Sequence, residues 1–65
     1  MEAIQLAEHL LKRIRERKSR MTDAIMEGSI SSWDEYRYVV GQIRGMVHAE
    51  EEIRSAMRSV ELDDD

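Results

Sequence analysis

The sequence predicts an all-α fold, an antiparallel two-helix hairpin with helices at about 2–27 and 33–60. Three observations support this fold: apolar residues recur at steps of three and four in both halves, a short break at residues 28–32 separates the two runs, and proline is absent. With 65 residues, the chain is one domain at most, near the lower size limit for independent folding. We assign residues 1–62 to the hairpin and residues 63–65 to an acidic disordered tail.

The first segment has the pattern of an amphipathic helix. Its stripe runs through Ile4, Ala7, Leu11, Ile14, Lys18, Met21 and Ile25. Gly28 follows this stripe and suits the left-handed backbone conformation that commonly ends a helix. The few residues between Gly28 and the next apolar run allow only a turn between antiparallel neighbours.

A capping box predicts that the second helix begins next to Ser32. We expect the Ser32 hydroxyl to accept the amide of Glu35, whose carboxylate returns to the amide of Ser32. The stripe then runs through Tyr36, Val39, Ile43, Met46, Glu50, Ile53, Met57 and Val60. Beyond residue 60, acidic side chains lie at the negative end of the helix dipole, so we expect this end to fray.

Both stripes are wider than a seam between two helices requires. The flanking apolar residues are Leu6, Leu10 and Ala24 in the first segment and Val40, Val47 and Ala49 in the second. An isolated hairpin leaves these flanks in water, whereas a four-helix bundle or a docking surface covers them. The sequence therefore predicts a hairpin that is completed by oligomerisation or by docking on a partner.

A strip of small residues marks one side of the second helix. Gly41, Gly45 and Ala49 recur at every fourth position. Each glycine in a helix interior costs about 1 kcal/mol relative to alanine, so a compensating contact is expected. The compensation is either close approach of another backbone or a local crossing of the first helix over the second.

Two charges interrupt the stripes. If the helices flank the turn symmetrically, the numbers of facing residues sum to about 61. This rule places Lys18 opposite Ile43 and Glu50 opposite Leu11, so Lys18 and Glu50 are not expected to meet directly. Such charges specify register or a contact between subunits, or they reach water at the edge of the seam. The whole predicted protein interface consists of Trp33, Val40, Gly41, Arg44, Gly45, Val47, Ala49, Lys18 and Glu50, with Trp33 the first hot-spot candidate.

Charge is distributed unevenly along the chain. The net charge is −4, but residues 1–28 carry six basic against five acidic side chains, while residues 29–65 carry four against nine. The halves are thus complementary, which favours pairing with each other or with a second copy. Nucleic-acid contact is the alternative for the basic run, through Lys12, Arg13, Arg15, Arg17 and Arg20. We do not favour nucleic-acid contact, because successive side chains point in different directions around a helix and no aromatic residue lies between the basic ones.

Several function classes find no support in the sequence. Cysteine is absent, and His9 and His48 are isolated, so we expect no metal site, no cofactor and no catalytic residues. No apolar stretch approaches the roughly 20 residues that a membrane span needs. We expect a non-enzymatic protein without a small-molecule substrate or a membrane contact.

Residues 35–46 resemble a segment of short helical proteins of tailed bacteriophages. The shared pattern is Tyr-Arg-x-x-x-Gly-x-Ile-x-Gly followed by a hydrophobic residue, here starting at Tyr36, with an Ala-Glu-x-x-Ile continuation from Ala49. Those proteins are similar to this chain in length and in their helix–break–helix plan. Because they tend to be associated with phage structural genes, the resemblance implies a virion or assembly role, and it brings no catalytic residues.

The leading hypothesis is therefore a small phage structural protein that docks on a capsid, portal or tail component, located in the virion. One alternative is a homodimeric four-helix bundle that binds nucleic acid as a regulator, similar in plan to ROP. The other is a phage-encoded inhibitor of a host protein, acting in the host cytoplasm.

Overall fold

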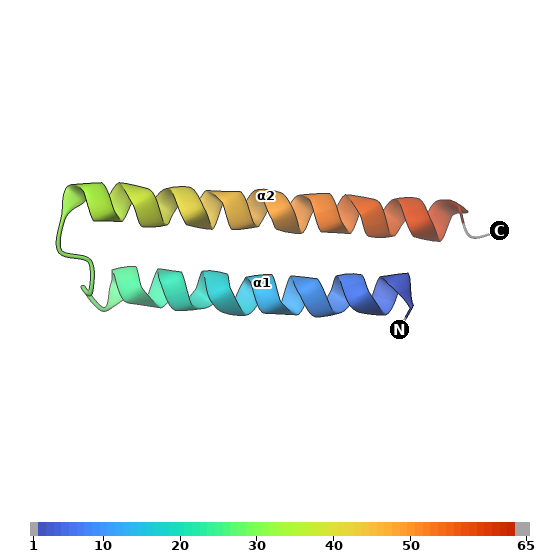
Figure 1. Cartoon of the computed structure of the whole chain (residues 1–65), viewed down its shortest axis with the longest axis horizontal. Coiled ribbons are helices and arrows are strands. Elements are labelled where there is room, and N and C mark those ends of the chain that lie inside the picture. Colours follow the sequence, from blue (N-terminus) through green and yellow to red (C-terminus); the bar gives the residue numbers. More distant parts are fainter. Residues whose placement is uncertain (1, 64–65) are drawn as a thin grey trace.

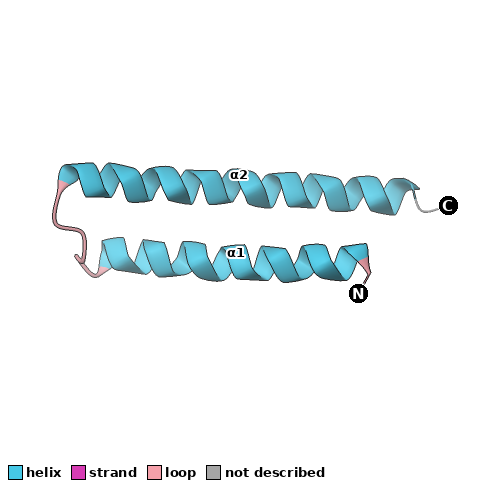
Figure 2. Cartoon of the chain, viewed as in Figure 1, coloured by secondary structure: helices cyan, strands magenta, loops and turns pink. Residues whose placement is uncertain are grey.

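Two antiparallel helices make up the fold (Figure 1). The computed structural model describes residues 2–63, in which α1 spans Ala3–Met26 and α2 spans Trp33–Asp63. Helices and connecting loops account for the whole of this described part, as Figure 2 shows. The molecule is a flat rod with extents of 52 × 17 × 13 Å. The predicted all-α hairpin is confirmed.

Local backbone chemistry explains both ends of α1. At its start, the amide of Glu2 donates to the side-chain oxygen of Gln5 at 3.2 Å. At its end, Gly28 has a φ of 75°. Its amide donates to the carbonyl of Ile25 at 3.2 Å, and the amide of Ser29 donates to the carbonyl of Ala24 at 3.0 Å. These two bonds form a Schellman motif, so the predicted role of Gly28 is confirmed.

The start of α2 follows the sequence prediction in part. The Ser32 hydroxyl accepts the amide of Glu35 at 3.1 Å, as expected. The Glu35 carboxylate, however, accepts the hydroxyl of Ser31 at 3.5 Å, where the capping box predicted the amide of Ser32. Asp34 and Glu35 also lie in the first turn, where negative charge is favourable.

The far end of α2 extends past its expected limit. The helix continues to Asp63, three residues beyond the expected end, so the first residue of the predicted tail is helical. An unfavourable charge at a helix end costs at most about 1 kcal/mol and is screened by water, which is too little to stop the helix. The other two residues of the predicted tail lie outside the described part of the chain.

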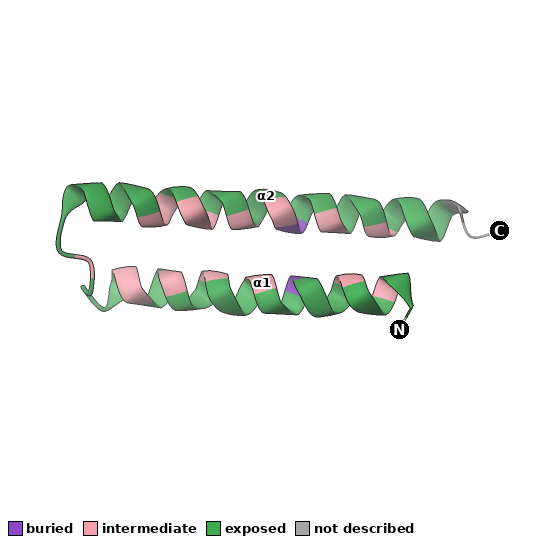
Figure 3. Ribbon diagram, viewed as in Figure 1, coloured by how far each residue is buried: buried purple, intermediate pink, exposed green. Residues whose placement is uncertain are grey.

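The core is a single thin seam between the helices. Leu11, at 5% exposure, is the one buried apolar side chain among the described residues. Figure 3 shows the half-buried residues along the facing sides of both helices, and they include Ile4, Ala7, Ile14, Lys18, Met21, Ile25, Val39, Ile43, Met46, Ile53 and Met57. The predicted stripes thus form the seam, except that Tyr36 and Val60, at its two ends, are exposed.

The hairpin leaves more surface in water than a compact protein of its size. Its accessible surface is 5324 Å². A compact monomer of 7.6 kDa exposes roughly 4,300 Å² by the usual scaling of surface with mass. The excess of about 1,000 Å² measures how much surface a single hairpin fails to cover.

Candidate protein-interaction surfaces

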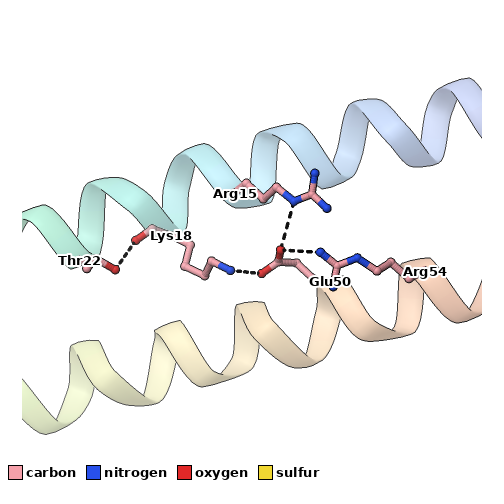
Figure 4. A network of polar contacts seen from close by, with 5 residues as sticks. All are labelled: Arg15, Lys18, Thr22, Glu50 and Arg54. Atoms are coloured by element: carbon pink, nitrogen blue, oxygen red, sulfur yellow. Dashed lines mark hydrogen bonds and ion pairs between the residues drawn. The ribbon is translucent and has the colours of Figure 1, made fainter.

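Glu50 is the centre of the only ion-pair network among the described residues (Figure 4). Its side chain lies in the seam, and the residue is only 3% exposed. The ammonium group of Lys18 donates to Oε1, and the Nε of Arg15 donates to Oε2 at 3.4 Å. Arg54, one turn further along α2, places Nη2 3.6 Å from Oε2. One nearly buried carboxylate is therefore neutralised by three cations from both helices.

The contact between Lys18 and Glu50 corrects the expectation that these residues lie apart. Side chains of a helix lean toward its N-terminus, and in an antiparallel pair the two seam side chains therefore lean toward each other. The backbone register itself is close to the expected one, because Ile4 and Met57, whose numbers sum to 61, line the same hollow. A rule based on backbone positions alone missed the lean of the side chains.

The network also sets the charge state of Glu50. The hydrogen bond from Lys18 is the main cause of a lowered pKa for this carboxyl, and Arg15 and Arg54 act in the same direction. Burial opposes them by raising the pKa, but the net shift is downward. Glu50 is thus held as a carboxylate, and its partners tie the two helices together at this height.

The basic run of α1 divides into two groups. Arg15 and Lys18 point to Glu50. Arg13, Arg17 and Arg20 instead line one shallow hollow together with Ile14. These three arginines follow each other at steps of four and three, so they share one side of the helix. Lys12 is exposed outside the hollow, so the basic run as a whole spreads around the helix as expected, although three of its arginines share one side.

The two helical glycines do not touch α1. A Cβ atom added at Gly41 or at Gly45 would meet no atom within 4 Å. The alternative that α1 crosses locally over these glycines is therefore wrong. Close approach of another molecule stays a prediction for this part of α2.

One largely exposed stripe of α2, in which Val40 is half-buried, combines aromatic, apolar and basic side chains. Trp33 is 69% exposed and stacks on Tyr36 with ring centroids 5.4 Å apart. Arg37, Val40 and Arg44 follow and line a shallow hollow with Tyr36 and Gly41. We call Trp33, Arg37, Val40, Arg44 and Val47 the α2 outer stripe, since their spacing of three and four places them on one side of the helix.

A second surface covers one broad side of the hairpin. We define the second face as Ala3, Leu6, Leu10, Arg13, Arg17 and Arg20 of α1 with Tyr38, Gln42, Gly45, Ala49, Glu52 and Ala56 of α2. Each set keeps the spacing of three and four over more than two heptads. Ala3 and Ala56 line one apolar hollow, which places both sets on the same side of the molecule. Leu6 and Leu10 are 48% and 45% exposed on this face.

The predicted interface residues do not form one surface. Trp33, Val40, Arg44 and Val47 lie on the α2 outer stripe, while Gly45 and Ala49 lie on the second face. Gly41 is exposed between them, and Lys18 and Glu50 lie in the seam. Leu6 and Leu10, which the prediction treated only as flanks, complete the surface that contains Gly45. Extending the heptad steps through the flanks of α1 was the signal that could have found them.

No helix of the described chain combines the length and the apolar character that a membrane crossing requires. His9 and His48 are exposed, and the described residues contain no group of three or more potential metal ligands. Comparison of the chain with protein-family models, with curated proteins and with solved structures finds no match.

Proposed function

We propose that this chain is a non-enzymatic interaction protein that docks on a protein partner through the α2 outer stripe. The observation that carries the proposal is Trp33, whose large ring lies in water beside Tyr36 at the start of a stripe with two valines and two arginines. Tryptophan, tyrosine and arginine are the residues most enriched at binding hot spots. A partner with an apolar groove and an acidic rim fits this stripe.

The phage resemblance gives the partner a class. The segment that resembles short phage proteins, residues 35–46, lies in α2 and contains most of the outer stripe. The proposed partner is therefore a capsid, portal or tail component, and the proposed location is the virion. The seam, with its Glu50 network, positions the stripe, because it fixes how α2 sits on α1.

Removing the hot spot tests this function. The double variant Trp33→Ser and Val40→Ser is expected to lower the amount of the protein in purified phage particles by about tenfold or more, because a buried aromatic anchor commonly contributes 2 kcal/mol or more to binding. Mass spectrometry of gradient-purified particles measures this amount. Circular dichroism of the isolated variant checks that it remains helical.

Leu62→Ser is the matched control, since Leu62 is also a large exposed apolar residue of α2. It lies about 44 Å from Trp33 along the helix axis at 1.5 Å per residue, and we expect it to leave incorporation unchanged. Equal incorporation of the double variant and of the control would contradict docking through the stripe. Absence of the unaltered protein from particles would contradict the virion assignment.

The shared hollow of Arg13, Arg17 and Arg20 supports a second candidate function, nucleic-acid binding. Three cations on one side of a helix suit successive phosphates, and such binding weakens steeply with salt. Salt-sensitive binding of RNA or DNA that is lost in Arg17→Glu would favour this candidate. Binding that does not respond to this substitution would exclude the hollow as its site.

A further inference from the structure

We propose that a second copy of this chain covers the second face, so that two hairpins form a four-helix bundle. The α2 outer stripe lies outside this face and remains exposed on both copies. The pairing is therefore separate from the proposed docking, and either can fail without the other. Three properties of the face point to a second copy as its occupant.

The first property is complementarity of size. The α1 half of the face carries large side chains, among them Leu6, Leu10 and Arg17, while half of the positions of the α2 half are small, namely Gly45, Ala49 and Ala56. Two large halves or two small halves would pack poorly against each other. Placing α1 of each copy over α2 of the other sets large side chains on small ones twice, as a two-fold interface requires.

The second property is complementarity of charge. Arg13 on the α1 half and Glu52 on the α2 half are both exposed, and neither forms an ion pair within the described chain. The Arg15 side chain reaches Glu50 across the seam, so long side chains of the two helices whose numbers sum to about 65 meet each other. Arg13 and Glu52 have the same sum. A two-fold axis parallel to the helices brings the side chain of Arg13 of each copy within reach of Glu52 of the other.

This arrangement fits the remaining side chains. The hollow shared by Ala3, Ile4, Ala7, Ala56, Met57 and Val60 places Leu6 near the height of Ala56 and, further along the helices, Arg17 near the height of Gly45. The glycine at this position gives the long stem of an arginine room to lie flat. Both turns lie at the same end of the bundle, and each helix is antiparallel to both of its neighbours.

The third property is area. The outline of the molecule on this side, 52 by 17 Å, sets an upper limit of about 880 Å² for the area of the face. A stable interface of standard size buries about 800 Å² on each partner. The uncovered excess of surface in the single hairpin is of the same size, so one partner of equal area restores the burial of a compact protein.

Light scattering coupled to size-exclusion chromatography of the full chain tests the pairing. We expect a dimer for the unaltered chain, and a Kd raised by roughly tenfold or more in Leu10→Glu, because a half-exposed leucine is replaced by a charge inside the interface. Val47→Glu is the matched control, with the same change in charge on the α2 outer stripe, and it is expected to stay dimeric. A monomer for the unaltered chain, folded or unfolded, would overturn the proposal, and so would a dimer unaffected by Leu10→Glu.

Charge exchange tests which helices meet. Arg13→Glu and Glu52→Arg each place like charges opposite one another and are expected to weaken self-association about tenfold. An equimolar mixture of the two variants forms opposite charges at both contacts, and we expect it to dimerise as tightly as the unaltered chain. A mixture that does not recover the dimer affinity of the unaltered chain would contradict the placement of α1 of one copy over α2 of the other. Neither result depends on binding to a phage component.

Discussion

Glu50 occupies a seam position at which the heptad pattern calls for an apolar side chain. The residue is tolerated there because Lys18 and two arginines surround its carboxylate. Its three partners are partly exposed and keep contact with water, which limits the cost of removing charge from solvent. Because the network joins the two helices at one height, we expect it to fix the register of the hairpin as well as to stabilise it.

Acid should weaken the hairpin through this residue. The pKa of Glu50 is lower in the folded chain than in the unfolded chain, so its ionised form stabilises the fold. The contribution is complete above the pKa of an unfolded glutamate, about 4.3, and is lost as pH falls through the lower folded value. We expect Glu50→Gln to lower the free energy of unfolding at pH 7 by about 1.5–3 kcal/mol.

Urea unfolding of both proteins between neutral and acidic pH measures this difference. Other carboxylates titrate in both proteins, so the informative quantity is the difference in the free energy of unfolding between the unaltered chain and Glu50→Gln. This difference should become smaller as Glu50 of the unaltered chain takes up a proton. A difference that is constant with pH would show that the network does not depend on the charge of Glu50.

At the scale of the elements, Gly28 and Gly41 have different roles. Gly28 needs its positive φ to close the Schellman motif. Gly41 has an ordinary helical backbone and open space around it. The same substitution should therefore have opposite effects at these two positions.

Gly28→Ala is expected to lower the free energy of unfolding by about 1–2 kcal/mol, because a side chain disfavours the left-handed conformation. Gly41→Ala should raise it by roughly 0.5–1 kcal/mol, because alanine has the higher helix propensity. Thermal unfolding followed by circular dichroism measures both changes under the same conditions. A loss of stability in Gly41→Ala would mean that another chain lies close to this glycine.

The elements were largely predictable from the sequence. The spacing of the apolar residues, the break at residues 28–32 and the capping residues located both helices. The seam positions followed from the spacing of residues such as Leu11 and Ile53. The contact between Lys18 and Glu50 was not predictable in this way. It depends on the lean of long side chains along the helix, which brings the ammonium group of Lys18 to Glu50.

The interaction surfaces were predictable only in part. The sequence showed that the stripes were too wide, but helix spacing alone does not show which flank of α1 lies beside which flank of α2. That relation follows from the antiparallel packing, which places Ala3 beside Ala56. The residues of the predicted interface are therefore distributed over the α2 outer stripe, the second face and the seam, and Leu6 and Leu10 were left out.

At the scale of the whole molecule, a thin rod with one buried leucine among its described residues has little buried apolar surface to stabilise it. If two copies pair through the second face, unfolding is coupled to dissociation, and the midpoint of thermal unfolding rises with protein concentration. Differential scanning calorimetry over a range of concentrations measures this dependence. We expect Leu10→Glu to weaken the dependence of the midpoint on protein concentration and Val47→Glu to leave it unchanged. A midpoint of the unaltered chain that does not depend on concentration would contradict the pairing.

The thin seam also bears on how many copies of the protein persist in a cell. Amides of a chain with so little buried surface open frequently, and the open form is a substrate for proteases. A copy that is held in an assembly opens less often, because binding stabilises the folded state. We therefore expect degradation to remove surplus chains, so that the number of available binding places, rather than the rate of synthesis, sets the amount that accumulates.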